Sequence, residues 1–318
     1  MRRARRALIA AAAALLAAPP AFAQAPTMKL LVGYTAGGPV DAAARQFAPA
    51  LAKELEWNVV VENRPGANAT LAGDLVSKAA PDGLTIWFAA SPPLTISPHI
   101  MKKMAFDPAK DLAAVAPVLA YYNVLVVARD SPHKSVQDLI AWGKANPGKV
   151  FYGSAGIGAS NHLSGELFAL QVGAQFSHVP YKGNAPSMTD VIGGQLTMMF
   201  DIIGGARPHI NGGRVRALAV TSPQRNPVLP DVPTMAESGL PGFDVGGFFG
   251  LYGPPKLGAD LVKKINEATR RALLNPELQK AWGEQGYVVW SGSPEQLAQR
   301  AAAERAMWGP VTKGISVD

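Results

Sequence analysis

The stretch "VGYTAGGPVDAAARQFA", residues 32–48, joins the end of an apolar strand to an amphipathic helix through a pair of glycines and a proline. Two structures fit such a junction. It is either a tight turn, which glycine and proline favour, or an anion site, because the first backbone N–H groups of a helix have no internal partner. Asp41 stands in the first turn of this helix, where it either caps the helix or contacts an amine or a water molecule of a ligand.

A second stretch, "KVFYGSAGIGASNHLSGELF" at residues 149–168, repeats the same order of strand, Gly/Ser turn and helix. One such turn is weak evidence of a ligand site. Two of them, one in each half of the chain, are stronger evidence, because ligands of open α/β sheets bind beyond the carboxyl ends of the strands. A pair of facing helix N-termini would suit a small molecule that carries carboxylates.

Strands and helices alternate along most of the chain, which is typical of parallel sheets covered by helices. The apolar patterns predict strands at 28–34, 57–63, 84–90, 123–129, 149–155, 176–182, 195–201, 214–222 and 287–290. Helical patterns cover 42–56, 69–79, 135–147, 161–173, 185–194, 205–213 and 259–274, and a last helix starts at 294. Pro49 predicts a kink or a break in the first helix, and Ser293 with Gln296 forms a capping box at the last.

The length of the chain predicts two lobes, because about 300 residues exceed what a single hydrophobic core usually serves. We therefore expect a two-lobed α/β protein in which each lobe is a sheet flanked by helices. The chain would cross between the lobes twice, near 121–124 and near 246–251. Lobe 1 would comprise residues 24–122 and 248–318, and lobe 2 residues 123–247.

The first 23 residues have the order of a signal peptide: a basic segment "MRRARR", a short apolar run and the small-residue site Ala21-Phe22-Ala23. We expect cleavage after Ala23 and export to the periplasm, by the Sec or the twin-arginine route; an uncleaved anchor is the alternative. The segment carries four arginines, so the net charge of +7 falls to +3 in the mature chain, with 26 basic against 23 acidic residues. This near-neutral chain has no basic stripe, and we expect no nucleic-acid partner.

No arrangement of residues in the sequence is typical of a catalytic, cofactor or metal site. The chain has no cysteine, and its histidines are scattered at His99, His133, His162, His178 and His209 without metal-ligand spacing. The glycines fit neither a dinucleotide fingerprint nor a P-loop, and Tyr152 stands where a nucleophile elbow needs glycine. We therefore expect a binding protein and not an enzyme.

The candidate ligand contacts are the residues of the two Gly-rich loops and the polar residues at nearby strand ends. Ser91 and Asp201 are either ligand contacts or turn residues, and a carboxylate at Asp201 would repel a bound carboxylate unless a donor or ordered water stood between them. The predicted site comprises Tyr34, Thr35, Ala36, Gly37, Gly38, Asp41, Ser91, Ser154, Ala155, Gly156, Gly158, Ser160 and Asp201.

Several segments occur together in a characteristic order: "GYTAGGPVDAAAR", "VVENRPGAN", "KAAPDGLTI", "GSAGIGASNHLSGELF", "VPYKGNAPSMTDVIGGQL" and "LPDVPTMAESGLPGF". Over essentially the whole mature chain they resemble the substrate-binding proteins of tripartite tricarboxylate transporters, the Bug family. The resemblance implies a periplasmic "Venus flytrap" fold that binds carboxylates. It also implies that loops 34–41 and 154–160 hold a ligand carboxylate through backbone amides, hydroxyls and bridging waters.

The chain departs from the family's pattern at several positions. Thr35 stands where a proline is common, Val40 replaces a frequent threonine, and Asn68-Ala69 interrupts a turn that is usually glycine-rich. The resemblance implies a monomer that captures a small carboxylate and delivers it to membrane transporter subunits. The alternative partner is a membrane sensor kinase to which the same kind of ligand is presented.

Overall fold

The computed structural model describes residues 25–313, so the predicted signal peptide lies outside the described residues. The N-terminal segment builds one half of the molecule. Its parallel strands are β1 (Thr27–Val32), β2 (Asn58–Asn63) and β3 (Thr85–Ala90). Helices α2 (Pro39–Leu55) and α3 (Thr70–Ser77) connect these strands, and the short helices α4 (Pro92–Thr95) and α5 (Ser97–Ile100) follow β3. The predicted alternation of strand and helix is confirmed here.

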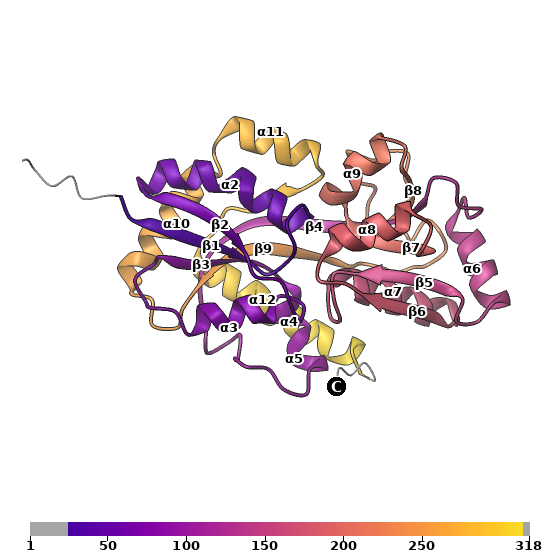
Figure 1. The fold of residues 1–318 in the computed structure, drawn as a ribbon, viewed down its shortest axis with the longest axis horizontal. Coiled ribbons are helices and arrows are strands. Elements are labelled where there is room, and N and C mark those ends of the chain that lie inside the picture. Colours follow the sequence, from indigo (N-terminus) through magenta and orange to yellow (C-terminus); the bar gives the residue numbers. More distant parts are fainter. Residues whose placement is uncertain (1–24, 314–318) are drawn as a thin grey trace, which may run out of the picture.

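The middle of the chain builds the other half of the molecule, on the right in Figure 1. Its strands are β5 (Val150–Ser154), β6 (Phe176–Pro180), β7 (Met198–Ile202) and β8 (Val215–Val220). Strand β5 pairs in parallel with both β6 and β7. The helices of this half are α6 (Val136–Ala145), α7 (Ser160–Val172), α8 (Asn184–Ile192) and α9 (Ile203–Asn211).

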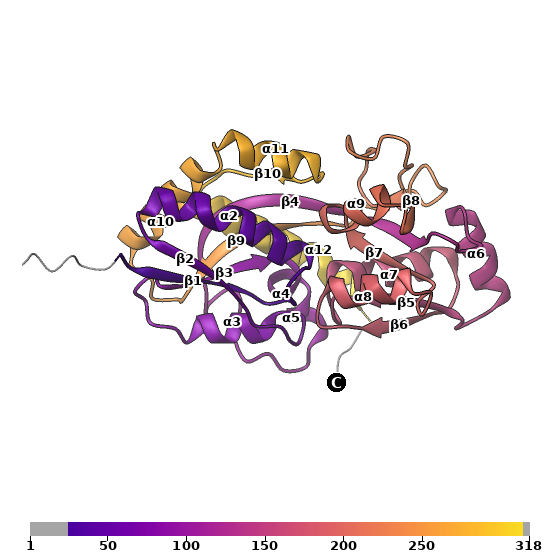
Figure 2. The same cartoon turned by 45° about the horizontal axis from the view of Figure 1, so that its top comes forward.

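Strand β4 (Ala113–Ala128) runs through both halves, and the chain returns to the first half at the start of β9 (Gly246–Gly253). Strand β4 pairs with β9 as far as Tyr122, and from Asn123 onward it pairs with β7 and β8 instead. Figures 1 and 2 both show β4 running from one half into the other. The strand order is therefore continuous, β2-β1-β3-β9-β4-β7-β5-β6, with β8 and β10 (Val288–Val289) also paired to β4.

The end of the chain returns to the first half, where α10 (Ala259–Ala272) packs on α2 and α12 (Pro294–Val311) packs on β4 and α4. Helix α11 (Pro276–Glu284) lies between them in the sequence, and Asn275 caps its first turn. The predicted capping box of the last helix is confirmed, because Ser293 and Gln296 each accept a hydrogen bond from the other's backbone N–H. Among the described residues, no helix combines the length and the apolar character that a membrane span requires.

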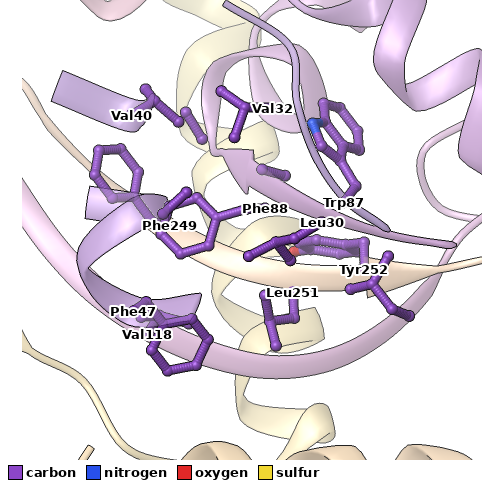
Figure 3. Close-up of a cluster of buried hydrophobic side chains, with 14 of the residues drawn as sticks. Leu30, Val32, Val40, Phe47, Trp87, Phe88, Val118, Phe249, Leu251 and Tyr252 are labelled. Carbon is purple, nitrogen blue, oxygen red and sulfur yellow. The ribbon is translucent and has the colours of Figure 1, made fainter. Parts of the chain in front are cut away.

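The buried apolar side chains form separate clusters on the two sides of the molecule. The largest lies between the β1-β3-β9-β4 sheet and helices α2, α10 and α12, and includes Phe47, Trp87, Phe88 and Phe249 (Figure 3). Two further clusters lie on β4 beyond Asn123 and on the strands and helices of the middle segment. Most residues of each cluster lie on one side, but the clusters also extend across the boundary. The largest includes Ala155, Ala159 and Ile202, and the second includes Ile96, Ile100 and Trp308.

The structure corrects four expectations from the sequence. Helix α2 continues past Pro49, so of the two expected effects of this proline the break is wrong. Strand β4 starts ten residues before the predicted strand 123–129, with an irregular register around Pro117. Proline has no N–H for the ladder and is tolerated at such irregularities, so the Ala- and Pro-rich segment lacks the usual pattern of a strand. Residues 246–253 form the paired strand β9 where only a crossing was expected, and helices α4, α5 and α11 were not predicted.

Candidate ligand site between two glycine-rich loops

Three long helices begin around one point between the halves. The N-cap residues of α2, α7 and α8 are Gly38, Ala159 and Gly183, and none of them makes a side-chain cap hydrogen bond. First-turn N–H groups of these helices are therefore open to a ligand and carry the positive end of the helix dipole. The exceptions are the His162 N–H of α7, which donates to Asn161 Oδ1, and Pro39 and Pro186, which have no N–H. A Cβ built on Gly38 would lie 3.9 Å from the Ala185 nitrogen and 4.0 Å from the Asn184 nitrogen, so the starts of α2 and α8 are neighbours across the two halves.

The first loop, residues 34–41, is held by a buried carboxylate. Asp41 is 3% exposed and accepts hydrogen bonds from the Gly37 N–H at 2.9 Å, from Arg45 Nε at 2.9 Å and from Asn63 Nδ2 at 2.9 Å. Burial raises the pKa of Asp41, but the hydrogen bonds from Arg45, Gly37 and Asn63 outweigh it and hold the pKa below its usual value. Asp41 thus stabilises its own turn. Its carboxylate oxygens already accept hydrogen bonds from the protein.

Two glycines in this loop have different roles. Gly37 has a φ of +80°, which a residue with a side chain adopts only under strain. Gly38 has a φ of −80°, and a Cβ added there would meet only ordinary van der Waals neighbours, the nearest being the Thr35 carbonyl oxygen at 3.5 Å. A side chain at Gly38 therefore needs no strained backbone, whereas one at Gly37 does.

The second loop, residues 154–160, is held by neutral groups. Asn161 Oδ1 accepts hydrogen bonds from the N–H groups of Ala155 and His162, both at 3.1 Å. The Ser154 hydroxyl accepts from the Gly156 N–H at 3.1 Å and lies 2.6 Å from Nε2 of His178. Ser154 is fully buried, so its hydroxyl braces the loop from within.

A small cavity lies where the two loops meet. It is lined by Tyr34, Val40, Ala90, Pro92 and Tyr121 from the first half, and by Ala155, Ala159, Ser160, Asn161, Asn184 and Ile202 from the second. Its volume is about 10 Å³, close to what one water molecule needs. The two halves are therefore closed on each other in this structure.

Direct contacts across the cleft account for this closure. The Thr35 N–H donates to the Lys182 carbonyl oxygen at 3.2 Å, and a Cβ built on Gly183 would lie 2.4 Å from the Thr35 hydroxyl. On the opposite rim, Asn68 approaches the second loop, since a Cβ built on Gly156 would lie 3.4 Å from the Asn68 backbone. Ala67, Asn68 and Ala69 all have positive φ, so this turn is strained where it meets the other half.

Of the thirteen residues predicted from the sequence, Tyr34, Ala155 and Ser160 line the cavity. Gly156 lines a neighbouring hollow of about 290 Å³ that also lies between the halves, and Gly158 packs against Ile100. Ala36 and Gly37 are exposed. The remaining residues lie around the cavity and not on its wall: Thr35 on the cleft, Gly38 at the α2 start, Asp41 and Ser154 within their loops, Ser91 beside Phe248, and Asp201 behind Asn184.

The cavity wall contains hydroxyl and amide groups but no basic side chain. Burial raises the pKa of Tyr121, while hydrogen bonds with Ser160 and Ser91 lower it in part, so the phenol stays neutral. Behind the wall, burial raises the pKa of Asp201 to about 7, although hydrogen bonds from Asn184 and the Ile202 N–H lower it. Asn184 is thus the donor that stands between the Asp201 carboxyl and the cavity.

Sequence reasoning missed several lining residues. Asn184 follows Gly183 at the start of α8, so a glycine before a helical pattern, as at Gly38, is the one local signal that points to it. Tyr121 and Ile202 are brought to the cavity by the pairing of β4 with β9 and β7, which no local pattern reveals.

Other hollows lie away from the two loops. One of them, of about 680 Å³, is lined by Arg129, Trp142 and Arg214 among others and involves neither Gly-rich loop. Within residues 25–313, no group of three or more histidine and acidic side chains is placed to hold a metal ion.

Comparison with known proteins identifies the family and the fold. The model of the tripartite tricarboxylate transporter family receptor, TctC, matches residues 43–317. The periplasmic binding protein BugD is 32% identical, with a TM-score of 0.88 over 91% of this chain and 97% of that chain. MatC from Rhodopseudomonas palustris with bound malate is 31% identical, with a TM-score of 0.87 over 90% of this chain and 98% of that chain.

A second R. palustris protein, solved with adipate, is 31% identical and has a TM-score of 0.88, covering 91% of this chain and 96% of that chain. Both the family match and these solved structures extend over nearly all of the described residues. The resemblance inferred from the loop motifs is confirmed, and the chain belongs to the tripartite tricarboxylate transporter receptor family.

Proposed function

We propose that this protein is a periplasmic receptor that captures a small carboxylate between its two lobes and delivers it to a tripartite membrane transporter. The observation that carries the proposal is the meeting of three uncapped helix N-termini, those of α2, α7 and α8, at one neutral polar cavity. Free amides and aligned dipoles bind an anion without any basic side chain. The bound malate and adipate of two relatives are ligands of this chemical class.

In this proposal the carboxylate lies against the backbone amides at the start of α2 and α7, with Ser160, Asn161, Tyr34 and Tyr121 as the hydroxyl and amide partners. The other residues of loops 34–41 and 154–160 shape the site. The cavity holds about one water molecule when closed, so the halves must separate to admit a ligand of malate's size.

The lobe boundaries are also part of the proposal. Lobe 1 comprises residues 24–122 and 248–318, and lobe 2 residues 123–247, with β4 and β9 as the hinge strands. The exchange of β4's partners between Tyr122 and Asn123 supports this division, as do the hydrophobic clusters, each of which lies mostly within one lobe. Export with cleavage after Ala23 and a monomeric state complete the proposal, and the intact mass of the periplasmic protein tests the cleavage site.

We further propose that the ligand is bound and released unchanged. The Ser154–His178 contact has the pairing of a nucleophile and a base, but Ser154 is fully buried and lies off the cavity wall. Its hydroxyl is therefore not placed to attack a bound molecule.

The experiment is a thermal-shift and calorimetric screen of four- to six-carbon dicarboxylates against the mature protein. A ligand with a micromolar Kd, at about a thousandfold excess, should stabilise the protein by about 4 kcal/mol, and mass spectrometry should recover it unchanged. Uptake of that ligand should be lost on deletion of the gene and restored by it. A product that accumulates with time would contradict simple binding, and normal uptake in the deletion strain would point to sensing instead of transport.

A further inference from the structure

Two histidines, the buried His162 and the partly buried His178, lie behind the second Gly-rich loop, and neither belongs to the cavity wall. His162 is in the first turn of α7 and is 4% exposed, and His178 is on the neighbouring strand β6. Their ring centroids are 4.1 Å apart, at an interplanar angle of 31°. We call His162 and His178 the histidine pair.

His162 holds the loop by a bond that requires a neutral ring. Its Nδ1 lies 3.1 Å from the Gly158 backbone nitrogen, whose N–H points at it. A backbone N–H can only donate, so Nδ1 accepts and carries no proton. Gly158 has a φ of +84° and packs against Ile100 of the other half, so this bond fixes the loop where the two halves meet.

His178 holds the other end of the same loop. Its Nε2 lies 2.6 Å from the Ser154 hydroxyl, which in turn accepts the Gly156 N–H. The pair thus fixes the backbone on both sides of Ala155 and Ser160, the loop residues that line the cavity.

The surroundings of the pair keep both rings neutral. Burial lowers the pKa of His162 to about 3, with a further contribution from His178, and burial lowers that of His178 to about 4. The titratable groups that face the pair are Tyr152 of β5, which stacks on both rings, and Glu166 of α7. Glu166 Oε1 lies 3.6 Å from His162 Nε2 and accepts a hydrogen bond from the Tyr152 hydroxyl.

We propose that His162 and His178 are positioning residues for ligand binding: as neutral rings they hold loop 154–160 in the shape that receives the ligand carboxylate, and a proton on His162 Nδ1 releases Gly158 and weakens binding. The proposal rests on the proposed function and adds the residues that set the geometry of the second loop. A protonated Nδ1 would turn a donor toward the Gly158 N–H, so the loop would lose its acceptor and two donors would face each other.

Matched variants separate the hydrogen bond from simple packing. In His162→Asn the side-chain oxygen stands about where Nδ1 stood and still accepts from Gly158, but it does not take up a proton. In His162→Ala the acceptor is lost. Malate, adipate or the best ligand of the dicarboxylate screen serves as the probe. At pH 7 we expect His162→Asn to keep the wild-type Kd within about twofold and His162→Ala to raise it about tenfold. His178→Gln and His178→Ala should differ in the same direction, because the Gln amide still reaches the Ser154 hydroxyl.

The pH dependence of the Kd distinguishes the two roles, because a residue that only packs would leave it unchanged. The ratio of the wild-type Kd to the His162→Asn Kd cancels the ligand's own titration. Because the pKa of His162 is lowered to about 3, this ratio should stay near one down to about pH 4 and rise as the pH falls to 3. Equal Kd values for His162→Asn and His162→Ala, or a ratio that stays flat with pH, would overturn the proposal.

A ligand-free measurement keeps this test independent of the proposed function. The Gly158 amide should exchange slowly with solvent in the wild type and in His162→Asn, and markedly faster in His162→Ala, while the amides of β5 stay protected in all three. If no dicarboxylate binds the wild type, the proposed function fails, yet these exchange rates still decide whether His162 positions the loop. Unchanged exchange at Gly158 in His162→Ala would refute the positioning role directly.

Discussion

The two Gly-rich loops have the same sequence plan but are stabilised in opposite ways. Loop 34–41 depends on an ionised carboxylate, since Asp41 binds the Gly37 N–H together with Arg45 and Asn63. Loop 154–160 depends on neutral groups, namely Asn161, Ser154 and the histidine pair. The shared order of strand, Gly-rich turn and helix thus gives both loops the same backbone path. The side chains that stabilise the turn differ between the two loops.

The way each loop is stabilised determines which charges surround the ligand site. Arg45, the charged partner of the first loop, is half-exposed and is not part of the cavity wall, and the second loop brings no charge at all. Both designs leave the helix amides free for an anion and place no permanent side-chain charge on the wall. Four sets of variants test this comparison, from the largest expected effect to the smallest.

Asp41→Asn should have the largest effect on stability. Every partner of the Asp41 carboxylate is a donor, so the amide nitrogen of an asparagine would face donors in a buried site. We expect a loss of about 3 kcal/mol in the free energy of unfolding, measured by denaturant titration at pH 7. The control is Arg45→Gln, which changes the half-exposed partner and should cost less than about 1 kcal/mol. Equal losses in the two variants would mean that the ion pair, and not the donor set, holds the loop.

His162→Asn should change how stability depends on pH. The pKa of His162 is lowered to about 3 in the folded protein, whereas the unfolded chain titrates near 6.5. Between these values only the unfolded state takes up the proton, so the wild type loses stability as the pH falls below 6.5. Removing this histidine should spare about 2 kcal/mol of that loss between pH 6.5 and pH 5. The measurement compares unfolding free energies of both proteins at the two pH values, and parallel losses would contradict a neutral buried ring.

Asp201→Asn should stabilise the protein, with the opposite pH dependence. Burial raises the pKa of Asp201 to about 7, so between pH 4 and pH 7 the unfolded carboxyl is ionised while the folded one keeps its proton. The wild type therefore loses stability as the pH rises through this window. The Asn variant avoids that cost and should gain about 1–2 kcal/mol at pH 8 and little at pH 4, by thermal melting at both. A loss of stability at pH 8 would show that the ionised carboxylate is needed by Asn184.

Substitutions at Gly37 and Gly38 should have the smallest effect on stability, and the two variants should differ in whether stability or ligand affinity changes. Gly37→Ala places a side chain at a φ of +80° and should cost about 1 kcal/mol of stability. Gly38→Ala fits its backbone and should leave the melting temperature of the free protein nearly unchanged, but its methyl group lies between the starts of α2 and α8 and should raise the ligand Kd. If both variants change only stability, the glycines are turn formers and not part of the ligand site.

The sequence predicted those features that short-range chemistry decides. Gly38 with Pro39, and Ser293 with Pro294 and Gln296, start helices because each position meets a local requirement for φ or for a cap. The two loops are predictable for the same reason. Within the site, however, only three of the predicted residues line the cavity, since the pattern of a turn does not say which side chains turn inward.

The remaining features depend on contacts between distant segments. His178 reaches Ser154 because β5 and β6 pair in parallel, and nothing near residue 178 indicates this. Only half of strand β4 is predictable because Pro117 lowers the local strand propensity, while pairing with β9 on both sides of the irregularity maintains the strand. Tertiary pairing decides these cases, and a single sequence carries little information about it.

The most direct test of the central claim is a nuclear magnetic resonance titration of the ¹⁵N-labelled mature protein with malate, adipate and the other dicarboxylates of the screen. We expect one of them to shift the amide signals of residues 37–41 and of 155–161 together, with a single Kd, because one carboxylate would engage the helix starts of both lobes at once. Shifts confined to one loop, or the absence of shifts in both loops with every dicarboxylate, would contradict the account.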